Sequence, residues 1–237
     1  MLNLGAAVVV MARSPEGPRP PKTRLAKIVP DETQRRRLYA AFLADIIATC
    51  GSLPDVIVRV AYTVDGGTAG FEAAGVSSRQ LLPQRGETLG DRERNLFEDL
   101  FQEGFSQVVA IGSDLPTLPR ERIVDATERL RGTTKRVVLG PSNDGGYYLI
   151  GLERPPGQTQ VPDLFTNVRW STQWTRADTI AAADLCGLAV EELDEWYDVD
   201  DEVGFTRLRA ELAIAAGARR APATARVMRE QILCGGF

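Results

Sequence analysis

The feature of this sequence that most constrains its fold is the segment from Val108 to Pro119. Its apolar run, Val-Val-Ala-Ile, ends abruptly at Gly112, and a single carboxylate, Asp114, follows two residues later. Parallel strands covered by helices on both faces are continuous apolar runs, and ligands bind where such strands end. The segment therefore predicts a buried parallel strand that carries Asp114 to the ligand-binding edge of a sheet. The alternative is that Asp114 only caps a turn or the next helix.

Apolar runs and segments of helical periodicity alternate along most of the chain. We expect strands at Ala6–Met11, Asp55–Ala61, Gln80–Arg85, Val108–Ile111, Arg136–Gly140, after Gly146, and at Leu188–Val190. We expect helices at Asp31–Cys50, within Gly86–Gly104, at Pro119–Arg131, Val161–Phe165 and Trp170–Cys186, from Glu202 to Ala216, and in the tail. This alternation is typical of an α/β protein with a mostly parallel sheet flanked by helices. We expect a single domain over residues 1–216 with a helical extension over residues 217–237.

Composition excludes several classes of function. The chain has 237 residues, 43% of them hydrophobic and 25% charged, which is ordinary for a globular protein. Its net charge of −4 argues against nucleic acid as a partner, because binding the phosphate backbone requires a concentrated basic surface. No apolar run is long enough to span a membrane, and no basic residues precede the Ala6–Met11 run as they would in a signal peptide. The 3 cysteines lack metal-ligand spacing, so we expect a cytoplasmic protein with reduced thiols and no membrane partner.

No histidine occurs in the sequence. Its absence rules out Ser-His-Asp and Cys-His catalysis, histidine-ligated zinc and a histidine general base. Any chemistry must therefore rest on carboxylates, lysine, arginine, hydroxyl groups, backbone amides and an oxygen-ligated metal.

A long loop follows the first predicted strand. The segment Ala12–Leu25 contains four prolines, which are incompatible with a helix or a central strand. Its basic residues are Arg13, Arg19, Lys22 and Arg24. A basic, glycine-containing loop at the carboxyl end of a strand can cradle phosphates, with lysine as a point charge and arginine as a fork. The alternative is a surface loop that is merely basic, since the segment is neither a Walker loop nor a G-x-G-x-x-G motif.

Acidic and glycine-rich motifs lie at the predicted ends of other strands. They are Gly112-Ser-Asp114, Asn143-Asp-Gly-Gly146 and Asp198-Val-Asp200. One basic loop facing several acids, without histidine, suits a nucleotide polyphosphate bridged to Mg²⁺ or Mn²⁺. In such a site the loop amides and basic side chains hold the phosphates while the carboxylates hold the metal.

With these motifs in this order, the sequence resembles the bacterial glycosyltransferase-A-like transferases described as radical-SAM/selenodomain-associated and labelled arsenosugar biosynthesis glycosyltransferases. These are distant relatives of the molybdenum-cofactor and phospholactate guanylyltransferases. The resemblance spans roughly residues 6–208 and is carried by residues 22–25, 84–92, 112–116, 140–152, 170–172 and 198–200. It implies a single-domain, Rossmann-like mixed sheet with the nucleotide over the loop that follows the first strand.

The resemblance also implies roles for individual residues. Asp114 resembles the metal-binding acid of glycosyltransferase-A folds, and Asp200 matches a second metal ligand. Lys22 matches a catalytic residue that contacts phosphate, and Asp144 matches a residue facing the acceptor, which could orient or deprotonate its hydroxyl. The residues expected to bind the nucleotide are Arg13, Lys22, Thr23, Arg24, Arg92, Ser113, Gly145 and Gly146.

Some positions depart from the family pattern or have a second interpretation. Gly17 stands five residues before Lys22 rather than three, so the first loop is longer than in relatives. Asp201 stands where relatives usually have threonine, which leaves Asp198, Asp200 and Asp201 as alternatives for the second metal ligand. Asp198 could equally be a helix cap, and Asp144 a turn residue.

Three functions are compatible with these residues. The first is a metal-dependent transferase that moves a glycosyl group from a nucleotide sugar to a small-molecule acceptor, with Lys22 and Arg24 stabilising the diphosphate leaving group. The second is a nucleotidyltransferase that joins a nucleoside triphosphate to a small phosphorylated substrate and releases pyrophosphate. The third is a non-catalytic nucleotide-binding protein. The base, the sugar, the acceptor and the oligomeric state are left open.

Overall fold

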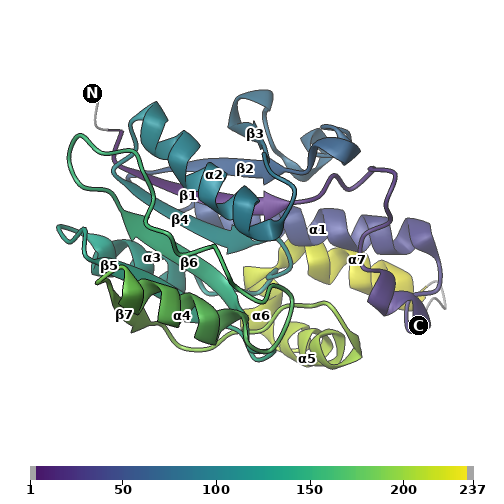
Figure 1. The fold of residues 1–237 in the computed structure, drawn as a ribbon. Helices are drawn as coiled ribbons and strands as arrows, with labels where there is room; N and C mark the ends of the chain where they lie inside the picture. Colours follow the sequence, from purple (N-terminus) through teal and green to yellow (C-terminus); the bar gives the residue numbers. More distant parts are fainter. Residues whose placement is uncertain (1–3, 234–237) are drawn as a thin grey trace.

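A computed structural model describes residues 4–233 of the chain, and over these residues the backbone forms one α/β domain around a seven-stranded sheet (Figure 1). The strands are β1 (Ala6–Ala12), β2 (Val56–Tyr62), β3 (Leu81–Pro83), β4 (Gln107–Gly112), β5 (Arg136–Pro141), β6 (Tyr147–Glu153) and β7 (Ala189–Glu192). Their spatial order is β3-β2-β1-β4-β6-β5-β7, and only β6 runs antiparallel to its neighbours. The predicted fold class, a mostly parallel mixed sheet flanked by helices, is confirmed.

Helices cover both faces of the sheet. The α-helices are α1 (Glu32–Gly51), α2 (Leu89–Glu103), α3 (Arg120–Leu130), α4 (Thr175–Leu185), α5 (Glu202–Leu212), α6 (Ala215–Arg220) and α7 (Pro222–Leu233), and the 3₁₀ helices are η1 (Thr23–Lys27), η2 (Val64–Gly66), η3 (Glu72–Ala74) and η4 (Ser78–Gln80). One hydrophobic cluster packs α1 and α3 against one face, and a second packs α2 and α4 against the other. Strand β1 is buried between them, as its continuous apolar run predicts.

Helix α7 packs on the outer side of α1 (Figure 1). The two oxygens of the Asp45 carboxylate accept hydrogen bonds from the backbone N–H groups of Ala223 and Thr224, at 2.9 and 2.8 Å. These amides belong to the first turn of α7, where N–H groups have no partner within the helix. A buried acid of α1 therefore fixes the start of the C-terminal helix, the segment predicted from the sequence as a helical extension.

Two helix predictions need correction. Residues 161–165 form no helix: the backbone N–H of Leu164 donates to the carbonyl oxygen of Pro162 at 2.7 Å, which closes a turn tighter than that of a helix. The predicted helix Trp170–Cys186 begins only at Thr175. Ser171 has φ 59°, the left-handed conformation, and this turns the chain before α4 starts.

Other boundaries agree with the predictions to within a few residues. Asp31 caps α1 by accepting a hydrogen bond from the backbone N–H of Gln34, and β3, with Pro83, is an edge strand. Phe97 and Phe101 are buried in the core. None of the helices in residues 4–233 is long and apolar enough to cross a membrane.

Candidate active site

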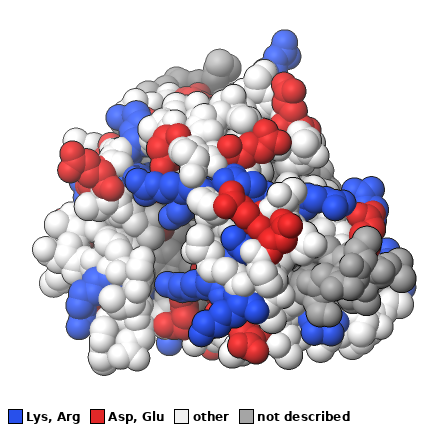
Figure 2. Space-filling view, turned by 90° about the vertical axis from the view of Figure 1, so that its right-hand side faces the viewer, with Lys and Arg blue, Asp and Glu red and all other residues white. Residues whose placement is uncertain are grey.

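The carboxyl ends of β1, β2 and β4 lie at one edge of the sheet, and a cavity of 590 Å³ opens there. We call it the first cavity. Of the site residues predicted from the sequence, those that line it are Arg13, Lys22, Thr23, Arg24, Arg92, Ser113, Asp114 and Asp200. Viewed from the side shown in Figure 2, Lys and Arg side chains form a band across the middle of the surface, with acidic side chains among them. The cavity thus brings together the basic loop and the acidic motifs, as the α/β layout predicts.

The long first loop is held in place from two sides. The Arg36 guanidinium of α1 donates hydrogen bonds to the carbonyl oxygens of Pro15 and Gly17, at 2.8 and 2.9 Å. On the other side, a Cβ built on Gly66 would lie 2.7 Å from Cβ of Ser14, so only glycine allows this close approach. The loop that carries Lys22 is therefore anchored on both α1 and the segment after β2.

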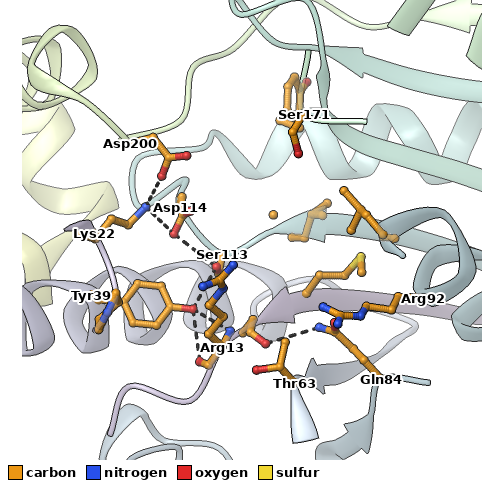
Figure 3. A pocket seen from close by; sticks show the side chains of 18 of the residues that line it. Arg13, Lys22, Tyr39, Thr63, Gln84, Arg92, Ser113, Asp114, Ser171 and Asp200 are labelled. Atoms are coloured by element: carbon orange, nitrogen blue, oxygen red, sulfur yellow. Dashed lines mark hydrogen bonds and ion pairs between the residues drawn. The ribbon is translucent and has the colours of Figure 1, made fainter. Parts of the chain in front are cut away.

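Lys22 is the centre of the charged part of the site. Its Nζ lies 2.7 Å from Oδ1 of Asp114 and 2.7 Å from Oδ1 of Asp200 (Figure 3). The Lys22 side chain is 3% exposed, against 28% for Asp114 and 42% for Asp200. A buried ammonium needs this pairing, because an unpaired charge away from water is strongly unfavourable. The first loop and the motifs after β4 and before α5 are therefore joined through one lysine.

Within this triad the charges of Lys22 and Asp200 favour each other, whereas burial and the Asp200 carboxylate raise the pKa of Asp114 against the effect of Lys22. Burial lowers the pKa of Lys22, but Asp114 and then Asp200 more than offset this, so the pKa lies above its ordinary value. Burial likewise raises the pKa of Asp200, and the Lys22 ammonium outweighs it, so that the pKa is lowered. Both shifts favour a cationic Lys22 beside an anionic Asp200.

Tyr39 of α1 extends the network to the first strand. Its hydroxyl accepts a hydrogen bond from the backbone N–H of Arg13 at 2.9 Å and lies 3.2 Å from Oγ of Ser113 (Figure 3). Ser113 in turn donates to Oδ1 of Asp114 at 3.3 Å. Ser113 thus helps to orient the acid that the sequence singled out. The sequence did not identify Tyr39, because its place in the apolar face of α1 is typical of a core residue.

The arrangement of these acids tests whether the site fits a divalent metal. Asp114 and Asp200 do converge on one point, but the Lys22 ammonium lies at that point. Over residues 4–233, no group of three or more Asp, Glu or Cys side chains is arranged to hold a metal ion. As the side chains lie, the predicted metal ligands do not fit Mg²⁺ or Mn²⁺, because Lys22 already supplies the positive charge between them.

A second cavity, of 220 Å³, adjoins the first. The residues that line both are Leu89, Glu93, Gly112, Asp114, Tyr147, Tyr148 and Ser171. The other polar residues of the second cavity are Ser142, Asp144, Thr172, Thr175 and Asp198. Asp198 therefore faces this cavity rather than capping α5; the cap is Asp201, which accepts a hydrogen bond from the backbone N–H of Gly204 at 2.9 Å. Burial, then the neighbouring Asp200 and Asp144 carboxylates, raise the pKa of Asp198 to about 6.

The Asn143–Gly146 motif forms the turn between β5 and β6. One oxygen of Asp144 accepts hydrogen bonds from Ser142 Oγ and from the backbone N–H of Gly146, the latter at 2.9 Å. Gly145 is not among the residues lining either cavity, and packs against the backbone of Gln173. Asp144 therefore stabilises a turn while also lining the second cavity, which Gly146 lines as well.

Replacing Gly145 by alanine should destabilise the fold. Its φ is +87°, and an added Cβ would lie 2.3 Å from the carbonyl oxygen of Gln173. A strained residue of this kind costs about 1–3 kcal/mol before the clash is counted. Gly132→Ala is the matched control, since Gly132 has φ +75° and open space around the added atom. Urea unfolding should show a larger loss of stability for Gly145→Ala; equal losses would mean that packing against Gln173 is unimportant.

Glu93 of α2 lies between the two cavities and was not identified from the sequence. It is 5% exposed, and its Oε2 accepts a hydrogen bond from the Tyr147 hydroxyl at 2.8 Å. Burial raises the pKa of Glu93 to about 7, although the hydrogen bond from Tyr147 opposes the shift. The run Asp91-Arg-Glu-Arg94 resembles a solvated helix face. The sequence feature that could have identified Glu93 as buried is its helical spacing from Leu96 and Phe97, with which it shares the buried face of α2.

Comparison with known proteins adds to this geometry. A family model described as "Uncharacterized protein conserved in bacteria (DUF2064)" matches residues 46–172. No curated protein sequence matches the chain.

Solved structures show similarity over nearly the whole chain. A crystal structure from Desulfovibrio desulfuricans G20, provisionally described as a nucleotide-diphospho-sugar transferase, has a TM-score of 0.84 at 26% identity, covering 98% of this chain and 96% of that one. CMP:2-keto-3-deoxy-manno-octonic acid synthetase complexed with CTP has a TM-score of 0.55 at 15% identity, covering 88% and 98%. The 4-diphosphocytidyl-2C-methyl-D-erythritol synthase of Anaerococcus prevotii DSM 20548 also has a TM-score of 0.55, at 9% identity, covering 88% and 96%. The fold is thus that of nucleotide-diphospho-sugar transferases, as the sequence predicted.

Proposed function

This chain belongs to the bacterial family DUF2064, and from that membership and the geometry of its site we propose that it is a transferase that uses a nucleotide-activated donor. The reaction that the site suits best is glycosyl transfer from a nucleotide sugar to a small-molecule acceptor. The similarity to a provisionally described nucleotide-diphospho-sugar transferase supports this class of reaction.

The observation that carries the proposal is the charge of the first cavity. Arg13, Lys22, Arg24 and Arg92 line one space, which is large enough for a nucleotide. Arginine and lysine bind phosphate oxygens by charge-assisted hydrogen bonds, and arginine can do so through two parallel bonds. The cavity lies where α/β sheets bind their ligands.

In this reaction the chain's own residues have separable roles. The diphosphate lies among the basic side chains, so the negative charge that develops on the leaving group is stabilised by fixed positive charges. Asp114 and Asp200 fix the position of the Lys22 ammonium. One of its N–H groups then donates a hydrogen bond to a phosphate oxygen. The acceptor hydroxyl loses its proton to a carboxylate of the second cavity, for which Asp144 and Glu93 are the candidates.

The second candidate function is nucleotidyl transfer. The same basic residues would hold the three phosphates of a nucleoside triphosphate, and pyrophosphate would leave. The family resemblance implies a role in arsenosugar biosynthesis, and this stays a prediction. The requirement for Mg²⁺ or Mn²⁺ also stays a prediction, and the position of Lys22 between the two acids does not favour it.

A thermal-shift panel separates the two reactions. Nucleoside triphosphates, nucleoside diphosphates and nucleotide sugars are each tested with Mg²⁺, with Mn²⁺ and with a chelator. A ligand at about 100 times its dissociation constant adds about 2.7 kcal/mol to the stability of the folded state. We expect the largest shift with one nucleoside diphosphate and its sugar. The largest shift with a triphosphate would favour nucleotidyl transfer, and no shift with any nucleotide would contradict the proposal.

A further inference from the structure

The second cavity differs in its charge from the first. Four carboxyl side chains line it: Glu93, Asp114, Asp144 and Asp198. Among the described residues that line it, none is lysine or arginine, whereas four basic side chains line the first cavity. A phosphate or carboxylate group placed in the second cavity would meet four acids, of which Asp114 is paired with Lys22 of the first cavity, and this is electrostatically unfavourable.

Backbone amides could still bind an anion, but three amides beside this cavity already donate within the chain. At the start of α4, the N–H of Trp174 donates to Oγ1 of Thr172 at 3.2 Å, and the N–H of Arg176 donates to the carbonyl oxygen of Gly145 at 3.0 Å. In the turn before β6, the N–H of Gly146 donates to Asp144 at 2.9 Å. These amides of the helix start and of the glycine turn, places where such folds often bind anions, are therefore already paired within the chain.

The remaining walls suit a small ligand with hydroxyl groups. Trp170 lies against Phe165 and meets Tyr147 edge-on, with ring centroids 6.4 Å apart in each pair. Gly90 leaves room for this indole, because a Cβ there would lie 2.7 Å from Nε1 of Trp170. Aromatic faces pack against the C–H groups of a polyol, while carboxylates accept hydrogen bonds from its hydroxyls. The volume of 220 Å³ suits a bound group of about the size of one monosaccharide.

Glu93 is the acid best placed to serve both cavities. Its hydrogen bond from Tyr147 is the only one recorded for its side chain within residues 4–233, and it uses Oε2. The carboxyl group thus keeps capacity to accept a hydrogen bond from a ligand, although it is 95% buried by the fold around it. A buried acid with one partner, lining a cavity, indicates a ligand that supplies further donors.

We propose, on the basis of the proposed function, that the second cavity is the acceptor subsite and that it takes an uncharged polyol, such as a monosaccharide unit, rather than a phosphorylated acceptor. Glu93 binds a hydroxyl of this ligand beside the donor's reacting carbon. This assignment separates the glycosyl-transfer reaction from nucleotidyl transfer to a phosphorylated substrate.

The test uses paired probes and the indole signal of Trp170. Neutral compounds (glucose, mannose and glycerol) and their matched monophosphates are titrated into ¹⁵N-labelled full-length protein, with Trp170→Phe identifying the Trp170 indole resonance. We expect a saturable shift of this resonance with at least one neutral compound and none with the phosphates. Above about pH 8, where the Glu93 carboxylate is ionised, Glu93→Gln should weaken binding of the neutral compound about tenfold, the effect of losing one charged hydrogen bond. Glu98→Gln, in the same helix but outside both cavities, should leave its affinity unchanged.

Tighter binding of a phosphorylated probe would overturn the proposal, and so would the absence of a Trp170 shift with every neutral probe. An equal affinity in wild type and Glu93→Gln would remove Glu93 from the subsite. These outcomes are independent of the nucleotide panel. If neutral sugars bind but no nucleotide does, the proposed function is contradicted, while the second cavity is still a binding site for polyols.

Discussion

Replacing Lys22 by methionine should remove turnover and weaken binding of the nucleotide donor by more than tenfold. The change keeps the length of a fully buried side chain but removes the charge that lies 2.7 Å from both Asp114 and Asp200. Breaking a buried ion pair by removing one partner costs about 3–5 kcal/mol, because the other charge is left uncompensated. The partial exposure of Asp200 reduces this cost. The phosphates would then face two bare carboxylates, so affinity measured by calorimetry should fall.

The control for this variant is Lys27→Met. Lys27 is an exposed residue of η1 that lines neither cavity, so its loss should change neither affinity nor turnover. Equal behaviour of the two variants would show that Lys22 has no special role. If circular dichroism shows that Lys22→Met is unfolded, Lys22→Arg is tested in its place. Arginine keeps the positive charge, but its larger guanidinium group cannot occupy the same point between the two acids.

The same variant tests the competition between lysine and metal. Because the Lys22 ammonium lies where Asp114 and Asp200 converge, a divalent cation can bind both acids only after Lys22 leaves. Without nucleotide, Lys22→Met should therefore bind Mn²⁺ more tightly than wild type does, as followed by the electron paramagnetic resonance of free Mn²⁺. Equal or weaker binding by the variant would mean that Lys22 and the metal do not compete for this point.

Glu93→Gln should make the protein more stable at neutral and alkaline pH. Burial raises the pKa of Glu93 from 4.5 to about 7, so between these values the folded state holds more protons than the unfolded state. Stability conferred by the neutral acid is therefore lost as pH rises through this window. A shift of this size corresponds to about 3 kcal/mol. Glutamine keeps an acceptor for Tyr147 without the charge, so urea unfolding should show a gain of roughly this size at about pH 8 and little at about pH 4.

Glu98→Gln on the same helix controls for the general loss of one negative charge. It should shift stability little at either pH, because Glu98 is partly exposed to solvent. A Glu93→Gln protein no more stable than wild type at about pH 8 would show that Glu93 is not held protonated by burial.

The rate should follow the same titration. A carboxylate that binds or deprotonates the acceptor must be ionised, so wild-type kcat/KM should rise as pH increases through about 7. Tyr147 of β6 donates a hydrogen bond to Glu93, and the charged residues Asp114 and Arg92 line the same cavity. Glu93→Gln should lose this limb of the pH profile. An unchanged profile in the variant would assign the limb to another group.

The sequence predicted most of the fold because β1, β4 and β5 contain continuous apolar runs bounded by turn residues. It also predicted which motifs lie together, because parallel strands end at a common edge of the sheet. The first loop follows β1, Asp114 follows β4, and Asp200 precedes α5. The failures have local causes. The segment before α4 has apolar residues at helical spacing, but Ser171 adopts a left-handed conformation there, and periodicity carries no information about one backbone angle.

The chemistry of the site was harder to predict than its position. Lys22, Asp114 and Asp200 could be assigned to phosphate and metal separately, but the pairing of Lys22 with both acids depends on a long-range approach of the first loop to the segment before α5. Glu93 was overlooked because a charged residue among charged neighbours is usually exposed. Only its helical spacing from Leu96 and Phe97 places it on the buried face. The polarity of the two cavities depends on side chains from many elements, which sequence spacing alone does not bring together.

The measurement that tests the central claim most directly is calorimetric titration of the nucleotide identified by the thermal-shift panel into wild type, Arg92→Ala and Lys27→Ala. Arg92 lines the first cavity, and Lys27 does not. If the first cavity holds the phosphates, Arg92→Ala should lose about tenfold or more in affinity, the contribution of a charged hydrogen bond, while Lys27→Ala matches wild type. The same affinity in all three proteins would place the nucleotide elsewhere and contradict the function proposed for this chain.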